Sequence, residues 1–333
     1  MIRTVYVERA VRDHARAREI LARLPGARLI EIERYGDVFN SHDQSFRVQK
    51  AAPALVLAEK VSRHVLAAPA GYGFPDRENF YFSHMLNCLY DCRYCFLQGM
   101  FASAHYVVFV NFADFTDAIE RTLEGAAGPS AFFSGYDCDS LAFEGVTGFV
   151  RTLLPFFAEH PEACLELRSK SVAVDALLES DPLPNCVAAW SLSPPEVADA
   201  LEHGAPSPGA RLGAMARLAE RGWPIGIRFD PLIYHQGYAD HYRRFFAEVF
   251  ERLPLSSVHS VSLGLFRRPS PFMKKLLRMY PEEPFLAAPL EDQDGVSSLR
   301  PELGDEMRAI CTRALLEHVP ESLLQPCFSG ETP

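Results

Sequence analysis

An alternation of six short apolar strands with amphipathic helices fills the middle of the chain and most constrains its fold. The strands are expected at 79–83, 131–134, 164–168, 187–191, 225–229 and 258–263, and the helices at 113–124, 145–159, 172–179, 209–221 and 239–253. Such alternation needs parallel strands joined by right-handed crossovers, and six units are too few to close a full barrel. The sequence therefore predicts an α/β fold built on a partial (βα)6 barrel.

Shorter segments flank this core. Residues 4–7, 10–24 and 28–33 are expected to form a β-α-β element, and the Ala/Pro/Gly-rich stretch 67–73 is typical of a linker. After the last strand, proline-rich turns precede a helix expected at 302–318. We predict an N-terminal α/β extension at 1–72, the barrel at 73–266 and a C-terminal extension at 267–333.

Three cysteines, Cys88, Cys92 and Cys95, follow the first barrel strand at C-x3-C-x2-C spacing. Active sites of parallel barrels lie at the C-terminal ends of the strands, where this loop should be. A four-iron cluster held only by protein takes four ligands, so three thiolates leave one iron open. This spacing is the signature of radical S-adenosylmethionine enzymes, whose cofactor chelates the open iron. Tyr94, just before the last cysteine, is expected near the adenine.

A zinc site is the alternative for the same residues. His84 lies four residues ahead of Cys88, so three cysteines and one histidine could bind a structural zinc in a binding protein without radical chemistry.

Composition limits the class of protein, its partners and its compartment. The 333 residues are 48% hydrophobic and 23% charged, as in ordinary globular proteins, and the net charge of −10 argues against broad attraction to polyphosphate. The start lacks the pattern of a signal peptide and no apolar run is long enough to span a bilayer, so a cytoplasmic protein is expected. A basic cluster is interpreted as a solvated helix face with its entry loop; it contains Arg267, Arg268, Lys274, Lys275 and Arg278.

Short motifs along most of the chain are similar to one known family. They lie at 4–9, 94–99, 106–111, 168–170, 190–193, 222–226 and 231–238. On these motifs the chain resembles the spore photoproduct lyase family of radical S-adenosylmethionine DNA-repair enzymes.

The resemblance implies a radical S-adenosylmethionine barrel, a 4Fe–4S cluster and S-adenosylmethionine as cofactors. It also implies cofactor cleavage to a 5′-deoxyadenosyl radical, which abstracts hydrogen from a thymine-dimer-type DNA lesion or a related nucleotide. Damaged DNA and a reductant such as flavodoxin or ferredoxin would be partners. The protein would supply binding, orientation and exclusion of side reactions, because the cofactor carries the chemistry.

Individual positions carry over from the resemblance. Cys88, Cys92 and Cys95 match the cluster ligands, and positions near the cofactor are matched by Ser134, Lys170, Ser191 and His235. Lys170 is chemically suited to the carboxylate of the cofactor.

Three departures from the family pattern concern the substrate. Tyr136 aligns with the hydrogen-donating cysteine of the family and Cys138 follows two residues later, so either is a candidate catalytic residue beside Tyr94. Phe96 replaces a tyrosine that relays a hydrogen atom. Residues 287–296 are acidic where the family has a basic hairpin, and a wedge that approaches phosphates should not be acidic. The same radical chemistry on a different small-molecule or peptide substrate is therefore the second alternative.

Overall fold

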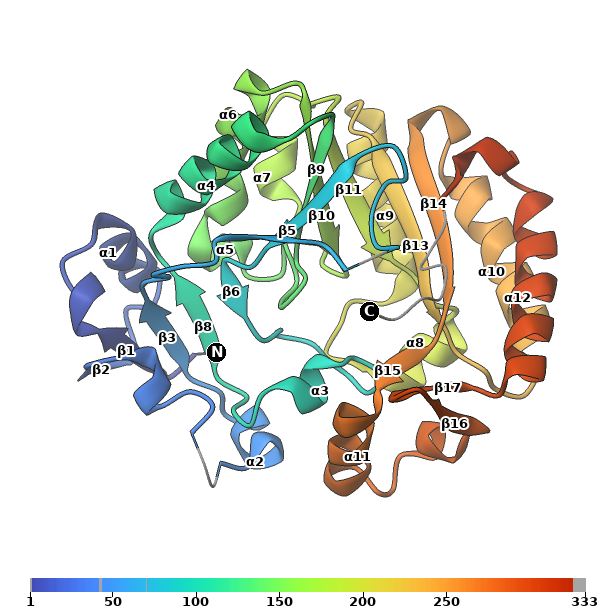
Figure 1. Cartoon of the computed structure of the whole chain (residues 1–333), viewed down its shortest axis with the longest axis horizontal. Coiled ribbons are helices and arrows are strands. Elements are labelled where there is room, and N and C mark those ends of the chain that lie inside the picture. Colours follow the sequence, from blue (N-terminus) through green and yellow to red (C-terminus); the bar gives the residue numbers. More distant parts are fainter. Residues whose placement is uncertain (1, 42–43, 70, 326–333) are drawn as a thin grey trace.

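A curled sheet of eight strands forms the centre of the protein, for which a computed structural model describes residues 2–41, 44–69 and 71–325. The strand order is β18-β14-β13-β11-β10-β9-β5-β4. All six strands expected from the sequence are present and run parallel as a half-barrel (Figure 1), which confirms the predicted fold class. Their bounds are β5 Glu78–Phe82, β9 Ser130–Ser134, β10 Ala163–Ser169, β11 Cys186–Ser191, β13 Ile225–Leu232 and β14 Val258–Leu265; β4 Val65–Ala67 and β18 Leu324–Gln325 form the edges.

Helices cover the outer face of the half-barrel and explain why its strands are largely buried and rich in apolar residues. Every residue of β9 and β11 is buried, as expected for parallel strands covered on both faces. The tryptophans Trp190 and Trp223 are fully buried in this core. The covering helices are α4 Phe112–Gly125, α6 Phe149–Glu159, α7 Asp175–Leu178, α9 Pro208–Glu220, α10 Tyr238–Arg252 and α12 Pro301–Leu316 (Figure 1).

Two of the differences from the sequence prediction concern helices between β9 and β13. The helix expected at 145–159 is split by Gly148, whose φ of +62° lies in the left-handed region that favours glycine, so α5 Glu144–Thr147 ends before α6 begins. Helix α8, Pro195–Leu201, was not expected, because seven residues are too few for a clear period.

A second sheet, of order β2-β1-β3-β8-β6, contains the expected N-terminal β-α-β element. Strands β6 and β8 of this sheet come from either side of the cysteine segment, so the sheet holds that segment at both ends. The elements are β1 Thr4–Glu8, α1 Ala15–Ala22, β2 Arg28–Ile32, α2 Phe46–Lys50, β3 Leu55–Ala58, β6 Met85–Leu86 and β8 Tyr106–Phe109.

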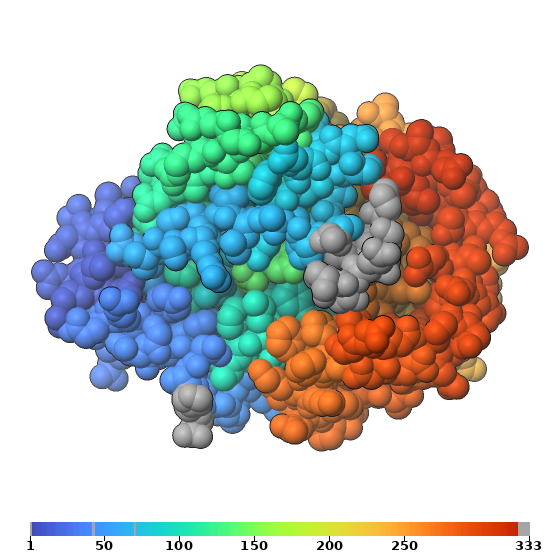
Figure 2. Space-filling model, in the orientation of Figure 1, coloured from blue at the N-terminus to red at the C-terminus, as the bar shows by residue number. Residues whose placement is uncertain are grey.

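The C-terminal part packs against the segment that follows the cysteines. Helix α11, Ser270–Met279, contacts α3, Leu97–Met100, so closely that a Cβ added to Gly99 would lie 2.7 Å from the carbonyl oxygen of Phe272. Figure 2 shows this teal segment between the blue N-terminal and orange C-terminal parts. Helix α11 follows β15 Arg267–Pro269, which pairs in a three-stranded antiparallel sheet with β17 Val296–Leu299 and β16 Leu290–Gln293.

Arg268 does not belong to the solvated basic cluster that the sequence predicts. Lys274, Lys275 and Arg278 are exposed on α11 as expected, but Arg268, assigned to the same solvated basic cluster, is buried with 1% of its surface exposed. Separately, no helix within the described ranges combines the length and apolar character needed to cross a bilayer.

Candidate active site

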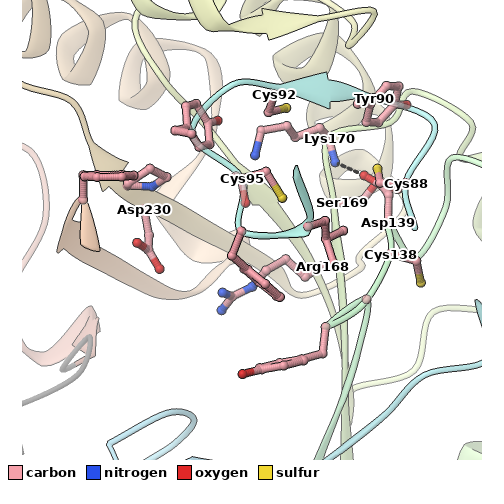
Figure 3. Close-up of a pocket in the computed structure, with 18 of the residues that line it drawn as sticks. Cys88, Tyr90, Cys92, Cys95, Cys138, Asp139, Arg168, Ser169, Lys170 and Asp230 are labelled. Atoms are coloured by element: carbon pink, nitrogen blue, oxygen red, sulfur yellow. Dashed lines mark hydrogen bonds between the residues drawn. The ribbon is translucent and has the colours of Figure 1, made fainter. Parts of the chain in front are cut away.

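A cavity of about 300 Å³ opens at the C-terminal ends of the barrel strands (Figure 3). Every barrel strand from β9 to β14 contributes a residue at or just beyond its end, and the loop after β5 contributes the three cysteines. The lining includes Cys88, Cys92, Tyr94, Cys95, Tyr136, Cys138, Ser169, Lys170, Ser191, Asp230 and Phe266. Residues far apart in the sequence therefore meet where parallel barrels place their chemistry.

The loop that carries the cysteines, residues 87–96, is fixed by backbone contacts on two sides. The Lys50 amino group donates hydrogen bonds to the carbonyl oxygens of Cys88 and Tyr90, at 2.7 and 3.0 Å. On the other side, the short strand β7, Asp91–Cys92, pairs antiparallel with β12, Glu202–His203. These contacts hold the loop in place through its backbone and leave the thiols for the cavity.

The three thiols line one cavity without converging on one point. In the part of the chain that the structure describes, no three His, Cys, Asp or Glu side chains are placed to hold a single metal ion. His84 instead stacks on Phe149, with ring centroids 3.7 Å apart and planes 2° apart. The zinc alternative therefore lacks its fourth ligand.

The donor set fits a four-iron cluster. Three soft thiols face one cavity, which is the ligand type and number that leave one iron open. Burial, then the nearby carboxylate of Asp139, raises the pKa of Cys88 to about 12, so the thiol as it stands is strongly disfavoured as an anion. Binding of cationic iron reverses that preference, because a coordinating thiol is deprotonated.

Lys170 reaches into the same cavity from the end of β10. Its backbone nitrogen donates to Asp139 at 2.7 Å, the dashed line of Figure 3, and the neighbouring Ser169 hydroxyl donates to the same carboxylate at 2.7 Å. The amino group of Lys170 lies 5.4 Å from the centroid of the Tyr94 ring. Asp139 thus anchors the backbone from which Lys170 extends toward the cysteine loop.

A buried carboxylate holds the aromatic ring of the cysteine loop. The hydroxyl of Tyr94 donates to Glu202, and Arg211 donates both to Glu202 and to the carbonyl oxygen of Ser191, the latter at 3.1 Å. Burial opposes ionisation of Glu202, but the charges of Lys170 and Arg211 outweigh it and hold its pKa below the usual range. The ionised Glu202 therefore fixes Tyr94 against the end of β11.

The two candidate hydrogen donors both line the cavity. Tyr136 stacks on Tyr81 with ring centroids 4.3 Å apart, and its centroid is 5.7 Å from that of Phe96. Cys138 is buried, and burial raises the pKa of its thiol well above the ordinary value. The phenol of Tyr136 therefore lies beside the residue that replaces the relay tyrosine of the family pattern.

Two expected cofactor-binding residues are not part of the lining. Ser134 is buried at the end of β9, and its hydroxyl has no hydrogen-bond partner among the described residues. His235 is bonded elsewhere: its Nδ1 lies 2.9 Å from the carbonyl oxygen of Ile233, and its Nε2 lies 2.8 Å from Nδ1 of His241.

Sequence reasoning missed three residues that organise the site, Lys50, Glu202 and Arg211. Each lies on or beside a helix, where charged residues usually face solvent, so no local signal distinguished them.

Comparison with known proteins finds relatives for most of the chain. A family model described as spore photoproduct lyase matches residues 79–284. Spore photoproduct lyase from Bacillus subtilis (strain 168) is 22% identical over 288 residues, which cover 84% of this chain and 82% of the relative. Spore photoproduct lyase from Geobacillus sp. (strain Y412MC61) is 25% identical over 199 residues, 59% of this chain and 58% of the relative.

Solved structures share the fold over nearly the full length. A mutant spore photoproduct lyase with bound AdoMet and dinucleoside spore photoproduct has a TM-score of 0.86 at 19% identity, with 98% of both chains covered. Spore photoproduct lyase complexed with dinucleoside spore photoproduct has a TM-score of 0.81 at the same identity and coverage.

Proposed function

Because the chain belongs to the spore photoproduct lyase family, we propose that it is a radical S-adenosylmethionine lyase acting on a thymine-dimer-type lesion or a related nucleotide. The observation that carries this proposal is the cavity at the ends of the barrel strands, which collects three thiols of one loop and a lysine of another strand. The relatives named for this activity align with most of the chain.

In this proposal, Cys88, Cys92 and Cys95 bind three irons of a 4Fe–4S cluster, and the fourth iron is left for S-adenosylmethionine. A flavodoxin- or ferredoxin-type protein would reduce the bound cluster. The cluster and S-adenosylmethionine together would supply the 5′-deoxyadenosyl radical that takes hydrogen from the substrate. Lys170 neutralises the carboxylate of the cofactor, and Tyr94 packs beside its adenine. Ser191 adds a hydroxyl at the end of the neighbouring strand.

The chain must also return a hydrogen atom to the product radical. Cys138 is the proposed donor, because thiols transfer a hydrogen atom rapidly to carbon radicals and Cys138 lies in the cavity lining. Transfer of that hydrogen atom leaves a sulfur-centred radical on Cys138. Tyr136 stacks on Tyr81 and lies tilted against Phe96. In this proposal it gives its phenolic hydrogen atom to the sulfur radical of Cys138 and then carries the radical itself, in place of the tyrosine that Phe96 replaces.

The charge of the C-terminal hairpin favours a short nucleotide over duplex DNA. Strands β16 and β17 form this hairpin, and it carries Glu291, Asp292 and Asp294. Asp292 accepts a hydrogen bond from the backbone of Gly295 at 2.9 Å. Hydrogen bonds from the Ser270 hydroxyl and then from Gly295 hold the pKa of Asp292 below its usual range, so it stays ionised. A carboxylate-bearing turn repels phosphates rather than releasing counterions from them.

The test is incubation of the anaerobically reconstituted, reduced protein with a dinucleotide photoproduct and, separately, with duplex DNA that carries the same lesion. We expect thymine monomers from the dinucleotide and slower conversion of the duplex. If the protein cleaves the cofactor but converts neither the dinucleotide nor the duplex, its substrate is a different small molecule or peptide. A protein that binds no iron would overturn the radical mechanism itself.

A further inference from the structure

Arg268 is a buried cation to which the described residues offer no hydrogen-bond acceptor. Only 1% of its surface is exposed, and within the described residues none of its three guanidinium nitrogens has a hydrogen-bond acceptor. A guanidinium carries five N–H donors, and a buried charge is costly unless it is paired. The fold therefore holds a desolvated positive charge that the described residues do not neutralise.

Arg268 lies beside the wall of the cavity. Phe266 and Arg267, which precede it in the chain, both line the cavity, and Phe266 packs in one apolar cluster with Cys92, Tyr94 and Cys95. Arg268 itself is buried, is not part of the lining, and pairs through β15 with Ser297 of β17. Arg268 therefore lies behind residues that face the cysteine loop.

One ionisable group whose charge acts on Arg268 belongs to the cysteine loop. Burial lowers the pKa of Arg268 to about 10, and the group whose charge counters this effect is the thiol of Cys95. In the described part of the chain no carboxylate forms an ion pair with Arg268, whereas Arg93 on the same loop pairs with Asp91 at 2.5 Å and with Glu283 at 3.6 Å. No carboxylate among the described residues thus compensates the charge of Arg268.

We propose that Arg268 is the charge partner of the iron–sulfur cluster, placed behind Cys95 to donate hydrogen bonds to its sulfur atoms and to stabilise the reduced form. This inference rests on the proposed function, since it presumes that the three cysteines bind a cluster. Reduction potentials of such clusters depend on net charge, hydrogen bonds to sulfur and solvent exposure, and a buried guanidinium acts on the first two.

The direction of the effect follows from charge. Reduction adds one electron from the external reductant to the cluster, so the reduced centre is more negative and gains more from a neighbouring cation. Arg268 therefore raises the reduction potential. In the apoprotein the same cation has nothing to neutralise it and lowers the stability of the fold.

The experiment compares Arg268→Met, Arg268→Lys and the exposed control Arg278→Met with the parent protein. Methionine preserves the apolar stem without the charge, and lysine preserves the charge. The midpoint potential of the reconstituted cluster, followed by EPR during a dithionite titration without S-adenosylmethionine, should fall in Arg268→Met. It should stay near the parent value in Arg268→Lys and in Arg278→Met, whose charge is screened by solvent.

A second measurement keeps the proposal testable if Arg268→Met binds the cluster poorly. The melting temperature of the apoprotein should rise in Arg268→Met, because the uncompensated charge is removed, while the gain on cluster loading should shrink. An unchanged potential in a fully loaded Arg268→Met protein, or an apoprotein destabilised by the substitution, would overturn the assignment. A parent protein that binds no iron would instead overturn the proposed function, so the two failures are distinguishable.

Discussion

Tyr94 donates its phenolic hydrogen to the buried carboxylate of Glu202, which Arg211 holds from the other side. This contact joins the cysteine loop to the segment that follows α8, where Glu202 also belongs to strand β12 and pairs with β7. The ring beside the proposed adenine site is thereby fixed before any cofactor binds.

Replacement of Glu202 by glutamine should destabilise the protein by about 3 kcal/mol, because Arg211 is left buried without its counter-charge. Urea unfolding measures this difference. The matched control is Glu196→Gln, which removes a surface ion pair with Arg244 at 3.0 Å and should change stability by less than about 0.5 kcal/mol. Equal effects of the two substitutions would contradict the role assigned to Glu202.

Substitution of Gly99 by alanine should loosen the contact between α3 and α11. The added Cβ would lie 2.7 Å from a backbone oxygen of Phe272, so we expect a loss of about 1–3 kcal/mol in thermal or urea unfolding. Gly145, within α5, has open space around its Cβ position, and Gly145→Ala should be neutral or stabilising by up to about 1 kcal/mol. A Gly99→Ala protein as stable as the parent would show that α11 does not press on α3.

His84 should make the fold sensitive to mild acid. Burial, aided by the charge of Lys60, lowers its pKa from 6.5 to about 3. The unfolded chain therefore takes up a proton on His84 below about pH 6.5 while the folded protein does not, so stability falls as pH decreases through that window. From about pH 7.5 to about pH 5 this group should cost about 2 kcal/mol.

The check on His84 is the difference between the parent and His84→Phe, which retains the stacking on Phe149. Urea unfolding at the two pH values should show a smaller loss in the variant by about that amount. If both proteins lose stability equally, His84 is not buried as a neutral base.

Cys138→Ala should leave cofactor cleavage intact and change only the distribution of products, because the hydrogen returned to the product radical would no longer come from this thiol. Mass analysis of the dinucleotide products measures the distribution. Cys311→Ala removes a buried thiol of α12, outside the cavity lining, and should leave the distribution as in the parent. Identical products from Cys138→Ala and the parent would exclude Cys138 as the donor, and Tyr136→Phe would then test the other candidate.

The sequence predicted those features that depend on local pattern. Strand alternation specified the six barrel strands, and the spacing of Cys88, Cys92 and Cys95 specified the loop that lines the cavity. Lys170 and Ser191 were expected from short motifs and are brought together by neighbouring strands. Their common feature is a position at the end of a barrel strand, where the fold itself dictates proximity.

Features that depend on tertiary contacts were not predictable. Glu202 follows a helix of only seven residues. Nothing in the local sequence distinguishes a buried glutamate at this position from an exposed one. Arg268 sits in a basic cluster whose other members on α11 are exposed, so its burial follows only from the way β15 packs behind the cysteine loop. Side chains that are buried by contacts with distant parts of the chain give no periodic hydrophobic pattern in the sequence.

The most direct test of this account is iron and sulfide analysis of protein reconstituted without oxygen, together with cleavage of S-adenosylmethionine under reducing conditions. The account predicts a brown parent protein that holds a 4Fe–4S cluster and cleaves the cofactor, and a Cys92→Ala protein that is folded but does neither. A parent protein that holds no iron, or a Cys92→Ala protein that still cleaves the cofactor, would contradict it.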